Sequence, residues 1–207
     1  MYKEYIPLFK SKAENKYKKI LDKYENKIDS TLKEYIKITA QKEKDLCLWQ
    51  SKFFGKPYLL KNNKYPTDDK GNYLYLLAQL NFSEIPAPSP YFPKKGLLQF
   101  WISPNDLYGL NFENRTKQDG FKIIYHKEVQ ENNDDLVQDF NFLPQIDSRN
   151  NWISEDPDQF AEYSLDFKLD QMPVTSCDIS FYKLFADEFK NHKFNKFDFM
   201  DEYNDIY

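Results

Sequence analysis

Glycine and proline cluster in the middle of the chain, and this distribution most limits the possible folds. All five glycines lie between residues 55 and 120, and seven of the 11 prolines lie between residues 57 and 104. Because these two residue types mark tight turns, the middle of the chain is predicted to be a meander of short β-strands. The flanking regions lack glycine, and they are predicted to form helices or longer loops.

Two segments outside the meander have apolar residues at helical spacing. An amphipathic helix is predicted over residues 11–30, with lysines and acids on its outer face. Its apolar positions are Tyr17, Ile20, Leu21, Tyr24 and Ile28. A second helix is predicted over residues 178–190, with Asp178 as the N-cap residue.

Alternating apolar residues predict a series of short strands between and beyond these helices. The predicted strands are 36–40, 46–50, 73–82, 97–103, 107–112, 121–126 and 163–169. In the 73–82 strand, the even-numbered residues from Leu74 to Phe82 are apolar, so this face is predicted to be buried. The fold class is therefore predicted as α+β and mainly β. The sheet is expected to be a curved antiparallel sheet or roll, with the N-terminal helix before it and the helix near 178–190 after it.

The side chains expected in the core come from three of these strands. They are Leu76, Leu80, Leu98, Phe100 and Ile123. With 207 residues, the chain is expected to form one globular domain, with an N-terminal helical segment over 1–34 and an α+β domain over 35–207.

Neither a membrane-spanning segment nor a secretory signal is apparent. The longest stretch without a charged residue is 13 residues, whereas a membrane helix needs about 20 apolar residues. The N-terminal residues contain no apolar signal-peptide core. We therefore expect a cytoplasmic protein without a membrane partner.

Acidic residues concentrate in the last third of the chain. Residues 129–207 contain 18 acidic and six basic residues, which gives a net charge of −12. Such a surface repels phosphate and other copies of itself, so we expect a monomer that does not bind nucleic acid. Four of the acids would share one face of a helix, and this face predicts a basic protein partner. They are Asp198, Asp201, Glu202 and Asp205.

The residue types used for catalysis and metal binding are sparse. The chain has two histidines and two cysteines, and none of them are at the close spacing of a structural zinc site. A nucleophilic pair of Cys177 with His192 stays open as an alternative. We found no phosphate-binding or nucleotide-binding glycine motif. We therefore expect no metal and no cofactor, and a non-catalytic binding protein is favoured over an enzyme.

A small-molecule groove is the alternative to the basic partner. Gln79 and Asn81 interrupt the apolar 73–82 strand, so a groove at this polar end would also include Lys52 and Tyr58. Such a groove would serve an enzyme or a small-molecule-binding protein. Ordinary edge-strand hydrogen bonding by these side chains is the structural explanation that competes with it.

Several segments in the middle of the chain follow one another in a distinctive order. They read Gln50-Ser-Lys-Phe-Phe-Gly-Lys-Pro-Tyr-Leu, Tyr65-Pro-Thr-Asp, Leu76-Leu-Ala-Gln-Leu-Asn-Phe-Ser-Glu-Ile-Pro, Phe92-Pro-Lys-Lys-Gly-Leu-Leu-Gln-Phe-Trp-Ile and Tyr108-Gly-Leu-Asn-Phe-Glu-Asn. Over about residues 35–190 this order resembles the YwqG-like family of bacterial proteins, a family of unknown function. The resemblance implies a cytosolic α+β protein with a curved antiparallel sheet, and it implies no activity, cofactor or catalytic residue.

The chain departs from the pattern of this family at two places. Family members usually have glycine where this chain has Phe54, so a turn here is expected to accommodate a side chain. Members also continue into further C-terminal strands, so a shortened C-terminal part is expected here. Such a part would leave an exposed sheet edge.

Overall fold

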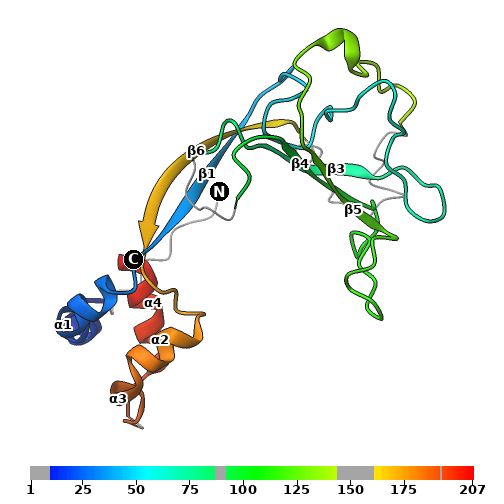
Figure 1. Cartoon of the computed structure of the whole chain (residues 1–207). Coiled ribbons are helices and arrows are strands. Elements are labelled where there is room, and N and C mark those ends of the chain that lie inside the picture. Colours follow the sequence, from blue (N-terminus) through cyan, green and yellow to red (C-terminus); the bar gives the residue numbers. More distant parts are fainter. Residues whose placement is uncertain (1–9, 87–91, 144–160, 192) are drawn as a thin grey trace. The chain divides into compact units, whose positions relative to one another are not determined.

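A computed structural model describes residues 10–86, 92–143, 161–191 and 193–207 (Figure 1). The chain divides into two compact units. A helical unit comprises residues 1–35 and 169–207, and a sheet unit comprises residues 36–168. The predicted domain boundaries at 1–34 and 35–207 stay a prediction.

The described residues of the helical unit form four helices. They are α1 (Lys10–Asp29), α2 (Ile179–Leu184), α3 (Ala186–Phe189) and α4 (Lys196–Ile206). The helix predicted over 11–30 is confirmed as α1. The helix predicted over 178–190 is confirmed as the α2–α3 pair, which is interrupted at Phe185. The Asp178 side chain accepts a hydrogen bond from the Ser180 N–H, so Asp178 is the N-cap residue as predicted.

Aromatic side chains form the core of the helical unit. Tyr17, Leu21, Tyr24 and Ile28 of α1 are buried, which confirms the predicted apolar face of this helix. They pack against Phe181, Phe185, Phe194, Phe199 and Tyr203. The Tyr203 hydroxyl also donates a hydrogen bond of 2.6 Å to the Val174 carbonyl oxygen, so the buried phenol is satisfied.

Within the described part of the chain, six strands form one sheet in the order β1-β6-β2-β3-β4-β5 (Figure 1). They are β1 (Lys33–Lys42), β2 (Lys52–Phe53), β3 (Tyr75–Asn81), β4 (Leu97–Ile102), β5 (Phe121–His126) and β6 (Tyr163–Met172). The ladders from β6 through β2, β3 and β4 to β5 are antiparallel. The predicted mainly-β α+β class is therefore confirmed. None of the helices in the described ranges is long and apolar enough to span a bilayer.

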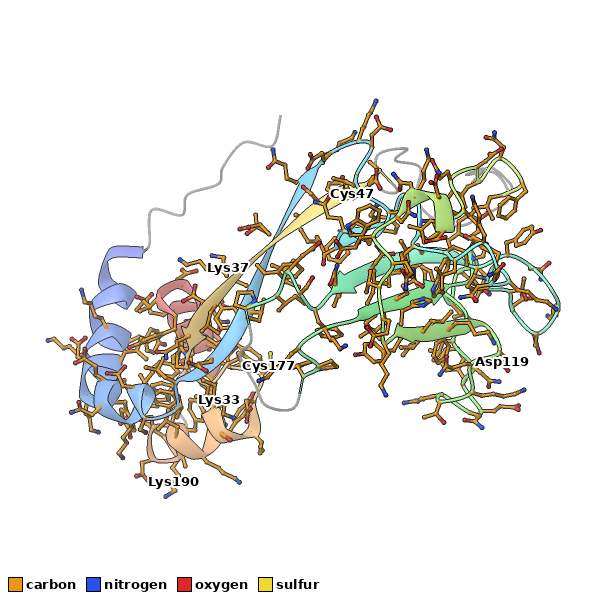
Figure 2. All side chains as sticks on the ribbon, turned by 45° about the horizontal axis from the view of Figure 1, so that its top comes forward. Lys33, Lys37, Cys47, Asp119, Cys177 and Lys190 are labelled. Carbon is orange, nitrogen blue, oxygen red and sulfur yellow. The ribbon has the colours of Figure 1, made fainter. Side chains whose placement is uncertain are left out.

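Two predicted strands are wrong, because side chains supply the backbone hydrogen bonds in both segments. Residues 107–112 form turns, in which the Asn105 side chain accepts from the N–H groups of Leu107 and Gly109 (Figure 2, near Asp119). Gly109 has φ +88°, and a side chain there would collide with the backbone of Gly120. Residues 46–50 are irregular, and amide side chains described below bind the carbonyl groups of residues 48–50.

A β-bulge in β3 changes which residues face the core. Leu76 pairs with Trp101 of β4, but the next pair is Ala78 with Phe100, so Leu77 is an extra residue without a partner in the ladder. Alternation therefore shifts by one residue at this point. Leu74 and Leu76 before the bulge lie on the same face as Gln79 and Asn81 after it.

The bulge corrects the predicted core. Leu76 is buried as predicted, and it packs with Leu74 and Trp101. Leu80, Leu98 and Phe100 are only half-buried, because they lie on the opposite face. Ile123 is 47% exposed, since it is opposite Phe100 on that same face. The prediction that these four side chains are buried is therefore wrong.

The two faces of β3 give a direct test of this assignment. We expect Leu76→Ala to lower the free energy of unfolding by about 3 kcal/mol, because it leaves a cavity in the core. Leu80→Ala is expected to cost less than about 2 kcal/mol, because its side chain is already partly in water. Urea unfolding of the two variants measures the difference. Equal losses would show that the faces are assigned wrongly.

Candidate functional site

Gln79 of β3 is the centre of a buried polar network. Its side chain is fully buried, and its Oε1 atom accepts from the Tyr58 N–H at 2.8 Å and from Gln99 Nε2 at 2.9 Å. Its Nε2 atom donates to the carbonyl oxygens of Leu48 and Gln50, each at 2.8 Å. One side chain thus provides hydrogen-bond partners for three backbone groups. These groups belong to two loops and lie outside the strand ladders.

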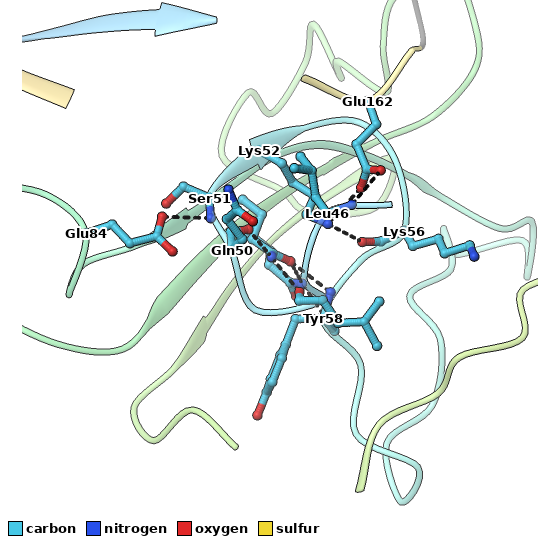
Figure 3. A network of polar contacts seen from close by, with 11 residues as sticks. Leu46, Gln50, Ser51, Lys52, Lys56, Tyr58, Glu84 and Glu162 are labelled. Carbon is cyan, nitrogen blue, oxygen red and sulfur yellow. Dashed lines mark hydrogen bonds and ion pairs between the residues drawn. The ribbon is translucent and has the colours of Figure 1, made fainter. Parts of the chain in front are cut away.

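The neighbouring residues extend this network along the same loop. Asn81 Nδ2 donates to the Trp49 carbonyl oxygen at 3.0 Å, and the Asn81 N–H donates to Ser51 Oγ at 2.8 Å. The Ser51 N–H donates to a Glu84 carboxylate oxygen at 2.9 Å (Figure 3). Residues 48–51 are therefore held against the sheet by side-chain hydrogen bonds instead of a ladder.

Gln99 of β4 links the network to His126 of β5. Gln99 Nε2 donates to the Tyr58 carbonyl oxygen at 2.8 Å, so its Oε1 atom is the acceptor for His126 Nε2 at 3.0 Å. The imidazole also contacts the Tyr58 ring edge to face, with centroids 5.0 Å apart. Burial lowers the pKa of His126 below its ordinary value, because the charged form loses water.

This burial predicts a pH dependence of stability. Because the pKa of His126 is lower in the folded than in the unfolded chain, the unfolded chain takes up the proton first as the pH falls below about 6.5. We therefore expect stability to decrease between about pH 7 and about pH 5.5. Urea unfolding across this range measures the slope.

A variant without the His126 imidazole provides the control for this prediction. His126→Gln keeps a polar side chain next to Gln99 and is expected to flatten the slope between about pH 7 and about pH 5.5. A wild-type slope in His126→Gln would contradict the assignment.

Lys52 and Glu162 form an ion pair at the junction of β2 and β6. Lys52 Nζ lies 2.8 Å from Glu162 Oε1 and donates to the Lys56 carbonyl oxygen at 3.3 Å (Figure 3). The Lys52 side chain is fully buried, whereas that of Glu162 is 14% exposed. Burial lowers the pKa of Lys52, and the hydrogen bond and charge of Glu162 partly oppose this shift.

The turn after Lys52 brings the chain close to this carboxylate. Phe54 has φ +55° and Gly55 has φ +72°, so both adopt the left-handed conformation. Phe54 therefore confirms that a side chain is accommodated where a glycine was expected. A side chain at Gly55 would collide with the Glu162 carboxylate.

The structure brings the four residues of the predicted groove together, but inside the protein. Lys52 is opposite Gln79 in the β2–β3 ladder, and Gln79 and Asn81 bind the loop over them. Lys52, Tyr58, Gln79 and Asn81 are all buried, so they line no surface groove here. Their hydrogen bonds show a structural role, and ligand binding by these residues stays a prediction.

An apolar pocket lies on the opposite face of the same strands. Its volume is about 260 Å³. Its described lining residues come from β1, β3, β4, β6 and the connection after β3: Ile36, Ile38, Leu80, Phe82, Ile85, Pro86, Phe92, Pro93, Lys94, Leu98, Phe100 and Phe167. Lys94 is the only charged side chain among them. Three of the residues expected in the core, Leu80, Leu98 and Phe100, are therefore part of the lining of a pocket.

The sequence contains one signal for this pocket. In β4 both alternating sets contain apolar residues, with Leu97 and Trp101 on one face and Leu98 and Phe100 on the other. A strand that is apolar on both faces is typical of a sheet covered on both sides. Here the described loops cover the face that contains the polar network. The opposite face, which contains the pocket, is only partly covered by the described residues.

A second, more polar hollow of about 440 Å³ lies over the turns at residues 68–70 and 103–120. Two of its four acids form hydrogen bonds or ion pairs within the turns. Asp68 accepts from the N–H groups of Lys70 and Asn72, and Asp119 pairs with Lys117 at 3.1 Å. Among the described residues, no group of histidine, cysteine, aspartate or glutamate is arranged to hold a metal ion.

The four acids of the predicted partner surface lie on α4. Asn195 caps this helix by accepting from the N–H groups of Phe197 and Asp198. Phe199 and Tyr203 on the inner face are buried. On the outer face, Asp198, Asp201 and Asp205 are exposed and Glu202 is half-buried.

Each of the chain's two units contains one cysteine, and both cysteines, labelled in Figure 2, are exposed. Cys177 belongs to the helical unit and Cys47 to the sheet unit. His192 lies outside the described residues, so the suggested pairing of Cys177 with His192 stays untested.

The fold is that of an α+β protein. One face of its sheet contains a buried polar network, and the opposite face contains an apolar pocket. The model of the family described as "Domain of unknown function (DUF1963)" matches residues 51–207. The chain belongs to this DUF1963 family. Comparison with curated proteins gave no match.

Proposed function

We propose that this DUF1963 protein is a non-catalytic binding protein and that the pocket between β1, β3, β4 and β6 holds an apolar ligand. One observation carries the proposal: 11 of the 12 described lining residues are apolar or proline, although the pocket is accessible from solvent. Covering Leu80, Leu98 and Phe100 with a ligand removes apolar surface from water. That transfer is the main driving force for binding at such a site.

Binding of the neutral dye Nile red tests this proposal. We expect its fluorescence to increase on addition of the protein, and Leu98→Gln in the pocket lining to weaken dye binding at least several-fold. Ile123→Gln is the matched control, because Ile123 is an exposed apolar residue of the neighbouring strand that does not line the pocket. Equal effects of the two variants, with both folded by circular dichroism, would contradict the proposal.

Within the DUF1963 family we place the chain among its YwqG-like bacterial members, in the cytoplasm. The order of the segments from Gln50 to Asn114 supports this placement. The protein is proposed to need no metal or cofactor. Exhaustive chelation is accordingly expected to leave its melting temperature unchanged.

A basic protein partner is a second candidate function, of the kind in which a protein neutralises or escorts its partner. The exposed acids of α4 favour it, because a cluster of one charge increases the rate of encounter with the opposite charge. The alternative of an enzyme that uses the four network residues has less support, since those residues are buried.

Charge reversal on α4 tests this second candidate. The four acids are replaced with lysine, and the basic proteins retained from a lysate of the source cell are compared with those retained by wild type. A control variant reverses four exposed acids of the sheet unit, namely Asp106, Glu113, Glu131 and Asp166. Loss of a retained basic protein only in the α4 variant supports the candidate. Retention by both variants contradicts it.

A further inference from the structure

We infer that the ligand of the apolar pocket carries one carboxylate, which Lys94 binds where the pocket meets solvent. This inference rests on the proposed apolar-ligand function and adds the charge of the ligand. It follows from the position of Lys94, from the pairing of the neighbouring lysine and from the size of the pocket.

Lys94 is the only charged side chain of the described lining, and it is exposed to solvent. It follows Phe92 and Pro93, which line the pocket with it, and proline restricts the backbone at this point. Among the residues that the structure describes, none forms an ion pair or hydrogen bond with Lys94. Its ammonium group is therefore available to a ligand.

The adjacent Lys95 differs in both respects. Its Nζ atom lies 2.8 Å from Glu128 Oε1, and its side chain does not line the pocket. The two lysines have the same charge and neighbouring positions in the sequence, but only Lys94 is directed to the pocket without an acidic partner. Lys95 is therefore a matched control for Lys94.

The size and lining of the pocket limit the rest of the ligand. A dry apolar cavity of about 150 Å³ holds benzene, and sites for drug-sized ligands are about 300–1,000 Å³. A pocket of about 260 Å³ therefore fits one small apolar body. A carboxylate on that body would stay at the solvent-facing end, where an ammonium attracts it and repels a cationic group.

Titration with three compounds that differ only in their charged end tests the inference. Decanoate, decanol and decylamine are titrated into wild type, Lys94→Gln and Lys95→Gln at low and high salt, with displacement of Nile red as the measurement. For an exposed ion pair we expect wild type to bind decanoate about two- to five-fold more tightly than decanol, and decylamine most weakly. Lys94→Gln should abolish the preference for decanoate over decanol, and Lys95→Gln should keep it.

The outcomes separate the two proposals. If decanoate and decanol bind equally, and Lys94→Gln changes neither, then the apolar pocket stands and the carboxylate inference is overturned. If none of the three compounds displaces the dye, both proposals are overturned. A preference for decanoate that decreases at high salt and disappears only in Lys94→Gln supports the inference.

Discussion

Replacing Glu162 with alanine is expected to lower the free energy of unfolding by about 3–5 kcal/mol. The reason is that Lys52 is fully buried and would lose the Glu162 carboxylate that lies 2.8 Å from its ammonium group. Its remaining contact in the described structure would be the Lys56 carbonyl oxygen at 3.3 Å. Chemical denaturation at neutral pH measures the loss.

The Lys95–Glu128 pair provides the control for this prediction. Its N–O distance is also 2.8 Å, but both side chains are largely exposed. Glu128→Ala is expected to cost less than about 1 kcal/mol, because water replaces the lost partner. Similar losses in the two variants would contradict the view that burial of Lys52 decides the result.

The pH dependence of the Glu162→Ala variant gives a second readout. Without Glu162, the folded pKa of Lys52 lies further below its unfolded value of about 10.4, because burial is opposed less. The unfolded chain then binds more protons, so stability is expected to rise as the pH increases toward that value. Adding Lys52→Met is expected to remove the pH dependence and restore part of the stability.

Replacing Gln79 with leucine is also expected to cost about 3–5 kcal/mol. Leucine has a similar size, so the loss would come from the carbonyl oxygens of Leu48 and Gln50 and the N–H of Tyr58. These buried groups would have no partner, and each unsatisfied group costs about 1–3 kcal/mol. Urea unfolding measures the change.

Gln138→Leu is the matched control, because Gln138 is exposed and its side chain donates a hydrogen bond of 2.9 Å to the Asn133 carbonyl oxygen. Its loss is expected to stay within about 0.5 kcal/mol. A Gln79→Leu variant as stable as this control would contradict the prediction, because it would show that the Gln79 hydrogen bonds do not hold the loops over β3.

The helices could be predicted from the sequence because their spacing depends on local geometry alone. In α1 the residues at helical spacing, among them Leu21 and Ile28, are the buried ones. The strands β3, β4, β5 and β6 were also predictable, since each is a short segment rich in apolar residues. The assignment of faces was not, because the extra residue at Leu77 is defined only by its position opposite β4.

The candidate site was predictable only in part. Gln79 and Asn81 were recognisable as polar residues in an apolar strand, and the structure places both with Lys52 and Tyr58. What the sequence could not indicate is that irregular segments such as 48–51 cover them, because those contacts join residues about 30 positions apart. The pocket residues Leu80 and Leu98 were mistaken for core residues because the bulge at Leu77 places Leu80, and Leu98 opposite it, on the pocket face of the sheet.

The bulge at Leu77 has a consequence for insertions and deletions in β3. Loss of the bulge residue Leu77 would restore an uninterrupted ladder in which Ala78 still pairs with Phe100 and Gln79 with Gln99. Gln79 and Asn81 would stay on the side of the loop that they bind, so the carbonyl groups of residues 48–50 would keep their partners. Among DUF1963 relatives that share this sheet, we therefore expect β3 to tolerate a one-residue gap at the position of Leu77. A one-residue gap between Ala78 and Asn81 would instead turn Asn81 to the pocket side, so none is expected there.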